Sequence, residues 1–139
     1  MPRDLILGYD DSAGARAALE AAIELAAELG DRLVIAFGYE PPGGMGEEVT
    51  AARAAVREVG QRFADHALAR ASAAGVTAEL ALVDARPVDA LLELAAERDA
   101  RMIVVGSYGD SPIKGAIIGA VPHKLLHLAE LPVLAVPAR

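Results

Sequence analysis

The chain has 139 residues, 54% of them hydrophobic, which suits one domain with a full-sized core. Its formal net charge of −7 argues against a general binder of nucleic acid or of anionic membranes, and the absence of cysteine excludes disulfides and thiolate metal sites. We expect a single cytoplasmic domain over residues 1–139, because the first apolar run is too short for a signal peptide and no stretch approaches the roughly 20 apolar residues that cross a bilayer.

The first half of the chain predicts two strands and two helices. Residues 4–9 form a short, nearly continuous apolar run, which is typical of a strand buried on both faces. Ser12 opens a helix, and Gly30 is its expected end. A second strand over 32–39, a loop rich in Pro and Gly over 40–48 and a long helix over 48–74 follow.

The second half continues the alternation of strand and helix. Residues 76–83 predict a third strand, and Pro87 begins a helix at a position that suits proline. A fourth strand over 101–106, a glycine-rich stretch over 106–120, a helix over 122–130 and a fifth strand over 132–137 complete the chain.

This alternation predicts an α/β, Rossmann-like fold, a doubly wound parallel sheet with helices on both faces. The common strand orders of five-stranded examples are 3-2-1-4-5 and 2-1-3-4-5. In the first order the winding reverses between strands 1 and 4, and ligands bind there at the carboxyl ends of the strands. Strand 1 ends in "GYDDS" and strand 4 in "GSYGDSPIKG", so this order brings two unusual loops together.

The glycine-rich stretch predicts a phosphate cradle. Glycines stand at 106, 109, 115 and 119, and a glycine loop lets backbone N–H groups turn toward an anion. The helix that follows adds free N–H groups and the positive end of its dipole. The local pattern leaves open the alternative that these glycines only make room for a tight connection from strand to helix.

The chain resembles the universal stress protein family over nearly its whole length. The residues that carry the resemblance are "LILGYDDS", "EPP" after strand 2, "MIVVGSYG" at strand 4 and "GAVPHKLLHLAELPVLAVP" at the end. In members that bind nucleotide the loop reads Gly, two residues, Gly, nine residues, Gly and then Ser or Thr. Gly106, Gly109 and Gly119 match that spacing.

The resemblance implies strand order 3-2-1-4-5 and a homodimer paired through the last strand, Val133–Val136. It also implies ATP or AMP as ligand, with Mg²⁺ as an accompanying ion. Adenine would lie near Asp10 and Gly38, and the phosphates on the three glycines of the loop. The expected partners are thus an adenine nucleotide and a second copy of the chain, with no nucleic acid and no membrane.

The chain departs from the family motif after the last glycine, where Ala120 replaces Ser or Thr. A hydroxyl there could bond a phosphate oxygen and cap the helix, and alanine can do neither. Pro122 also removes one N–H from the helix start. His123 and Lys124 bring positive charge to that helix start, where it opposes the dipole, so His123 is a candidate phosphate ligand.

Other polar residues have simpler interpretations. Asp11 is expected to serve the turn after strand 1, and Lys114 and Arg86 are read as solvated. His66 and His127 are read as lone helix histidines, and no pairing of histidines suggests a metal site. No catalytic residues stand out, since there is no thiol and no "GxSxG" frame around the serines.

Three function classes remain open. The first is a regulatory module that responds to stress by binding ATP or AMP, which the glycines favour. The second is a dimeric interaction module without nucleotide, which Ala120 favours. The third is an enzyme that hydrolyses ATP slowly. A phosphoacceptor receiver domain is disfavoured, because the fifth strand ends in "VPAR" without the lysine that such a domain requires.

Overall fold

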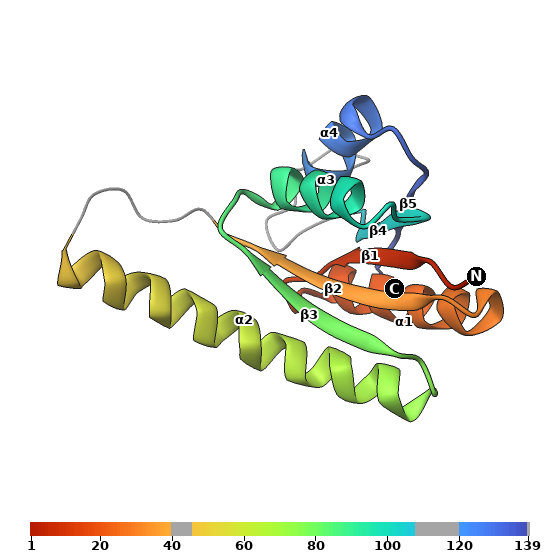
Figure 1. Cartoon of the computed structure of the whole chain (residues 1–139), viewed down its shortest axis with the longest axis horizontal. Coiled ribbons are helices and arrows are strands. Elements are labelled where there is room, and N and C mark those ends of the chain that lie inside the picture. The colour runs from red at the N-terminus through yellow and green to blue at the C-terminus, as the bar shows by residue number, and fades with distance from the viewer. Residues whose placement is uncertain (40–45, 108–119, 139) are drawn as a thin grey trace.

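The computed structural model describes residues 1–39, 46–107 and 120–138, in which strands and helices alternate along the chain (Figure 1). The strands are β1 (Asp4–Gly8), β2 (Arg32–Gly38), β3 (Ala78–Val83), β4 (Met102–Gly106) and β5 (Val133–Val136). The helices are α1 (Ala13–Leu29), α2 (Glu47–Ala73), α3 (Pro87–Glu97) and α4 (Ala120–Leu128). Every strand begins and ends within two residues of its predicted bounds.

The strands form one parallel sheet in the order β3-β2-β1-β4-β5. This confirms the predicted α/β fold and selects the order 3-2-1-4-5. β1 lies at the centre, where Leu5 is level with Leu33 of β2 and Met102 of β4. The winding therefore reverses between β1 and β4, as the sequence predicted.

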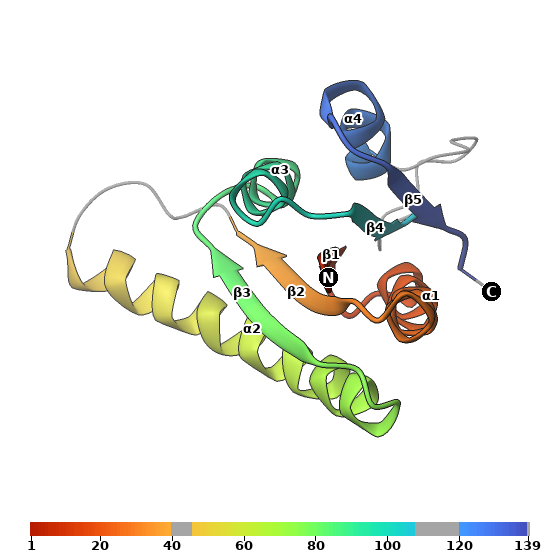
Figure 2. The same cartoon turned by 45° about the vertical axis from the view of Figure 1, so that its right-hand side comes forward.

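Helices cover both faces of the sheet, with α1 and α2 on one face and α3 and α4 on the other (Figure 2). Successive side chains of a strand point to opposite faces, so β1 contributes to two cores. Leu5 and Leu7 pack in the core under α1 and α2, and Ile6 packs in the core under α3 and α4. All three side chains are fully buried, which explains the continuous apolar run in the sequence.

The ends of α1 confirm the sequence prediction. The Ser12 hydroxyl accepts a hydrogen bond from the Ala15 N–H at 3.1 Å, which satisfies one of the free donors at the helix start. Gly30 ends the helix in the left-handed conformation with φ of 71°.

The predicted start of α4 was wrong by two residues. The helix begins at Ala120 rather than at Pro122. Pro122 lies in the first turn, where the backbone N–H has no partner inside the helix and the fixed φ of proline suits the helix. Ala120 is thus already helical, and it does not occupy the capping position that the sequence analysis assigned to it.

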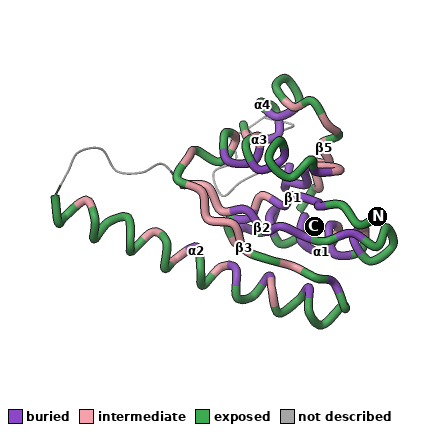
Figure 3. Tube along the Cα trace, viewed as in Figure 1, coloured by how far each residue is buried: buried purple, intermediate pink, exposed green. Residues whose placement is uncertain are grey.

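α2 has 27 residues, and its first half projects beyond the sheet (Figure 3). No residue from Glu47 to Val59 is buried, and the helix is anchored through its second half. The buried positions there are Gly60, Ala64, Ala67 and Ala71. Among the described helices, none is long and apolar enough to cross a membrane.

Candidate functional site

The strand register brings the candidate loops to the carboxyl edge of the sheet. Leu7 of β1 is level with Val104 of β4, so continuing the register by two residues sets Tyr9 level with Gly106. On the other side the Tyr9 N–H donates to the Ala36 carbonyl at 3.1 Å. Asp10, the next residue, therefore leaves the sheet beside the ends of both β2 and β4.

Asp10 is exposed at this edge and shapes the turn into α1. Its Oδ1 accepts a hydrogen bond from the Ser12 N–H at 3.0 Å, which is an Asx turn. Asp10 thus has a structural role in the turn in addition to its predicted place beside adenine. The turn also fixes the orientation of the carboxylate, so the two roles are compatible.

Asp11 belongs to a polar network that the sequence analysis did not predict. The sequence analysis expected this residue only to serve the turn after β1. It adopts φ of 61°, and its Oδ1 accepts from the buried Tyr9 hydroxyl at 2.9 Å. The Arg16 guanidinium donates to both carboxylate oxygens at 3.0 Å. These Arg16 hydrogen bonds lower the pKa of Asp11. The pKa of Tyr9 is raised to about 12, mainly by burial and secondly by its hydrogen bond to Asp11. Tyr9 therefore stays protonated and donates.

Gly106 has a packing role that the loop motif did not reveal. A Cβ at this position would lie 2.6 Å from the carbonyl carbon and 2.7 Å from the carbonyl oxygen of Gly14. Both atoms belong to the backbone near the start of α1, so they cannot rotate away. Gly106 thus lets the start of α1 approach the end of β4 closely.

Gly38, the predicted neighbour of adenine, is likewise needed for packing. A Cβ there would lie 2.8 Å from the Cβ of Ala90 and 3.0 Å from both the Ala85 carbonyl oxygen and the Cα of Pro87. The end of β2 therefore presses directly on the start of α3. For Gly38 and Gly106, close packing alone accounts for glycine.

The remaining candidates divide between α4 and residues outside the described ranges. Ala120 and His123 are exposed in the first turn of α4, a helix that packs on α3, β4 and β5. Gly109, Gly119 and Lys114 lie outside the described residues. The structure thus brings Asp10, Gly38 and Gly106 to one edge of the sheet. The predicted role of the loop between β4 and α4 rests on the sequence alone.

A second polar network at this edge was missed by the sequence analysis. The Arg57 guanidinium of α2 donates to the hydroxyl of the buried Tyr39 at 2.9 Å. Arg57 and Arg53 also approach Asp84, which follows β3, at 3.8 and 4.0 Å. The signal in the sequence was the repeated pair Gly-Tyr at the ends of β1 and β2, which places a tyrosine hydroxyl at each strand end.

Ser107 is a further polar residue at the end of β4. Its backbone N–H donates to the Val136 carbonyl at 2.9 Å, and its buried hydroxyl has no hydrogen-bond partner in the described part of the chain. A buried polar group favours a partner, so this hydroxyl adds a possible donor beside Gly106.

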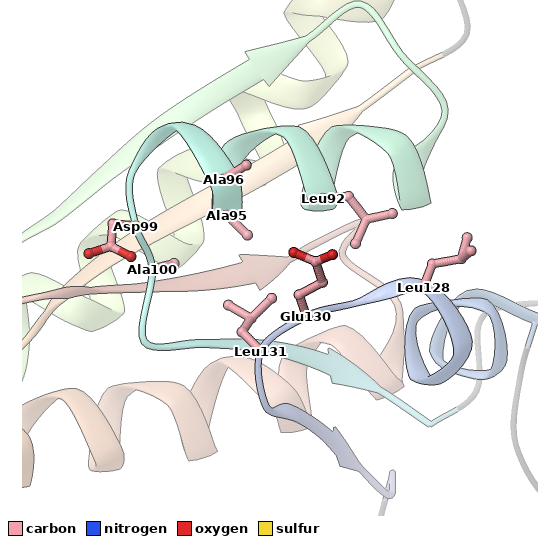
Figure 4. Close-up of a pocket in the computed structure, with 8 residues that line it drawn as sticks. All are labelled: Leu92, Ala95, Ala96, Asp99, Ala100, Leu128, Glu130 and Leu131. Carbon is pink, nitrogen blue, oxygen red and sulfur yellow. The ribbon is translucent and has the colours of Figure 1, made fainter.

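The described residues contain no cluster of three or more side chains suited to a metal ion. A cavity of about 360 Å³ lies between α3 and the end of α4 (Figure 4). Leu92, Leu128 and Leu131 line it together with Glu130 (Figure 4). This cavity is at the amino end of β4 and β5, opposite the edge that carries Asp10, and is a separate feature.

The model of the universal stress protein family matches residues 1–137. The chain belongs to the universal stress protein family. A universal stress protein of Thermus aquaticus is 33% identical over 142 aligned positions, which cover 98% of this chain and 99% of the relative. Universal stress protein YxiE of Bacillus subtilis is 36% identical over 81 residues, and that match spans 58% of this chain but only 55% of the relative.

A solved universal stress protein in complex with cAMP is similar over the whole fold. It is 30% identical, with a TM-score of 0.80, and the match covers 99% of this chain and 98% of that one. More distant universal stress proteins, from Archaeoglobus fulgidus with dAMP and from Arabidopsis thaliana with AMP, share the fold at TM-scores of 0.66 and 0.71. Adenine nucleotides are thus ligands of several members with this fold.

Proposed function

We propose that this universal stress protein is a stress-response regulator that binds an adenine nucleotide between the end of β1 and the loop that follows β4. The observation that carries the proposal is the similar structure in complex with cAMP, which aligns over 99% of this chain at 30% identity. The position agrees with the rule that open parallel sheets bind ligands where the winding reverses.

Each site residue has a physical role in this proposal. The Asp10 carboxylate, oriented by its turn, accepts hydrogen bonds from the adenine or the ribose. Gly38 and Gly106 keep α3 and α1 packed closely against the strand ends beside this site. Gly109 and Gly119 provide backbone N–H groups for the phosphates, and Ala120 and His123 lie at the following helix start, which favours anions. ATP or AMP is the proposed ligand, with Mg²⁺ accompanying ATP.

Calorimetry and thermal melting with AMP, cAMP and ATP, with and without Mg²⁺, test this function. At a ligand concentration of about 100 times Kd, binding adds roughly 2.7 kcal/mol to the free energy of unfolding. Gly109→Val and Gly119→Val should abolish binding, because the added side chains fill space that the phosphates need. If the parent binds none of these nucleotides, the chain is an interaction module without nucleotide.

The variant Ala120→Ser tests the proposed phosphate contact at position 120. The added hydroxyl offers one hydrogen bond to a charged phosphate, worth roughly 1.5–3 kcal/mol, or about tenfold to a hundredfold in affinity. Because Ala120 is already helical, the serine is not expected to cap α4, and melting should rise only in the presence of nucleotide. The control is Ala54→Ser, at an exposed position of α2. An equal rise without nucleotide would contradict the proposed phosphate contact.

We also propose that the regulator acts in the cytoplasm as a homodimer paired through Val133–Val136. The support for pairing is that β5 is an edge strand with four apolar side chains, each only partly buried. An exposed apolar edge tends to associate unless it is covered or paired. The absence of cysteine agrees with a reducing compartment.

A further inference from the structure

α4 presents two histidines from consecutive turns. His123 and His127 are four positions apart, so they lie on the same side of the helix, and both are exposed. Their rings are in contact, with centres 4.8 Å apart and planes at 78° to each other. The sequence analysis read His127 as a lone helix histidine, and the contact between the rings changes that interpretation.

The separation of the rings fits a shared metal ion. An ion bonded to both imidazoles at about 2.0–2.1 Å lies roughly 3.2 Å from each ring centre, so a ligand angle of about 90–110° separates the ring centres by roughly 4.5–5.3 Å. The observed 4.8 Å lies inside this range. Exposed rings turn freely about the bond to Cβ, so both can aim a nitrogen at one point without moving the helix.

We propose that His123 and His127 together bind one divalent transition-metal ion on the surface of α4. Imidazole nitrogen suits Zn²⁺, Ni²⁺ and Cu²⁺, whereas Mg²⁺ and Ca²⁺ prefer oxygen. Water fills the remaining coordination positions, as in zinc sites that keep an open position. The helix fixes the spacing of the two ligands in advance, which reduces the entropy lost on binding.

This metal site shares only His123 with the proposed nucleotide site. It uses no residue of the glycine loop, and His127 is not a candidate nucleotide ligand. His123 is the one residue named in both, so His127 is the cleaner position for a variant. The test is made without nucleotide, and its result therefore does not depend on whether nucleotide binds.

Titration calorimetry of the full chain, free of any histidine tag, with NiCl₂ and ZnCl₂ tests the proposal. We expect one ion per chain. His123→Ala and His127→Ala should each weaken binding about tenfold or more, because the second ligand then no longer acts at a high effective concentration. The matched control is His66→Ala, which removes an exposed histidine from α2 and should leave the affinity unchanged.

Cu²⁺ paramagnetic resonance provides a second readout. The parent should show two coordinated imidazole nitrogens, and either single variant only one. Both side chains are exposed, so circular dichroism of the variants should match the parent. Binding as tight in His127→Ala as in the parent, or an equal loss in His66→Ala, would overturn the proposal. One ion per two chains would also overturn it, since the site would then be shared between copies.

Discussion

At the scale of single residues, Gly106 combines a place in a family motif with a packing role. Its missing side chain faces the Gly14 backbone, which a Cβ would meet at 2.6–3.0 Å. We expect Gly106→Ala to lower the free energy of unfolding by about 1–3 kcal/mol, the usual cost of overpacking a close contact. Urea denaturation of the variant without nucleotide measures this cost. Unchanged stability would show that α1 and β4 can separate without strain.

Asp31, just before β2, gives a second prediction at this scale. Its buried carboxylate accepts from the Arg101 Nε at 2.5 Å and from the Arg3 backbone N–H at 2.9 Å. Burial, the largest influence, raises the pKa of Asp31, but these hydrogen bonds and the two positive charges together lower it below the ordinary 3.8. A lowered pKa in the folded state means that stability is present above the ordinary value and is lost as pH falls through the folded value.

Asp31→Asn should therefore lower the free energy of unfolding by about 1–2 kcal/mol at pH 7, because charged hydrogen bonds to a buried carboxylate are lost while water still reaches the partly exposed Arg101. Below about pH 4 the parent should lose stability more steeply than the variant, because only the parent must protonate Asp31 there. Urea titrations at pH 7, 5 and 3.5 compare the two. The control is Asp99→Asn, at an exposed carboxylate 3.8 Å from Arg3, which should behave as the parent at each pH.

Local signals in the sequence correctly predicted the roles of residues whose partners lie close along the chain. Ser12 and Gly30 were correctly assigned to the ends of α1, because capping depends on residues within a few positions. The Asp31–Arg101 pair spans 70 positions, and the contact between Gly106 and Gly14 joins residues of different elements. Such contacts are fixed by the packing of the folded chain, so no local pattern predicted them.

At the scale of elements, α2 consists of an anchored half and a projecting half. The second half packs through Ala64, Ala67 and Ala71, whereas the first half has no buried residue up to Val59. Amides in the first half should therefore exchange with solvent faster than those around Ala64–Ala71, since local opening there exposes no core. Hydrogen exchange read by mass spectrometry resolves the two halves.

Asp84→Asn tests what holds the projecting half in place. The ion pairs of Asp84 with Arg53 and Arg57 link this half to the end of β3. Exposed pairs contribute about 0.2–1 kcal/mol each, so losing both should raise exchange in residues 47–59 about twofold to thirtyfold. Exchange around Ala67 should stay constant. The control is Asp65→Asn, which removes an exposed carboxylate from the same helix. An equal rise in exchange from this control would show that the ion pairs of Asp84 do not hold the projecting half in place.

The start of α4 shows why helix boundaries are harder to predict than helices. The sequence analysis expected the helix to begin at Pro122, and the first helical position is where proline is most frequent. Proline is tolerated throughout the first turn, however, and the buried Pro122 side chain packs there against the rest of the protein. The interpretation of Ala120 as a missing cap depended on that boundary and failed with it.

At the scale of the whole molecule, the edge strand β5 makes the proposed dimer testable. The carbonyls of Pro132 and Val136 accept from the N–H groups of Ile103 and Ser107, so they face β4. Backbone groups of alternate residues point to opposite sides of a strand, and those of Ala135 therefore face away from β4. A second copy pairing with β5 would use the Ala135 N–H.

Ala135→Pro should thus convert the dimer to a monomer while leaving the pairing of β5 with β4 intact, because proline lacks the N–H that faces outward. Light scattering at micromolar concentration measures the assembly, and thermal melting checks the fold. Ala138→Pro, beyond the end of β5, is the control and should remain dimeric. A parent that is monomeric under these conditions, or a dimer that survives Ala135→Pro, would rule out pairing through β5.

The buried carboxylates and their arginines are gathered at the amino edge of the sheet. Asp4, the first residue of β1, accepts from the Arg32 Nε at 2.8 Å and also approaches Arg98, while Asp31 holds Arg101 before β4. Substitutions in the loops at the opposite edge therefore leave these ion pairs untouched. Loops at that edge can thus be exchanged, provided that Gly38 and Gly106 are kept, without losing the ion pairs that join the strands at the amino edge.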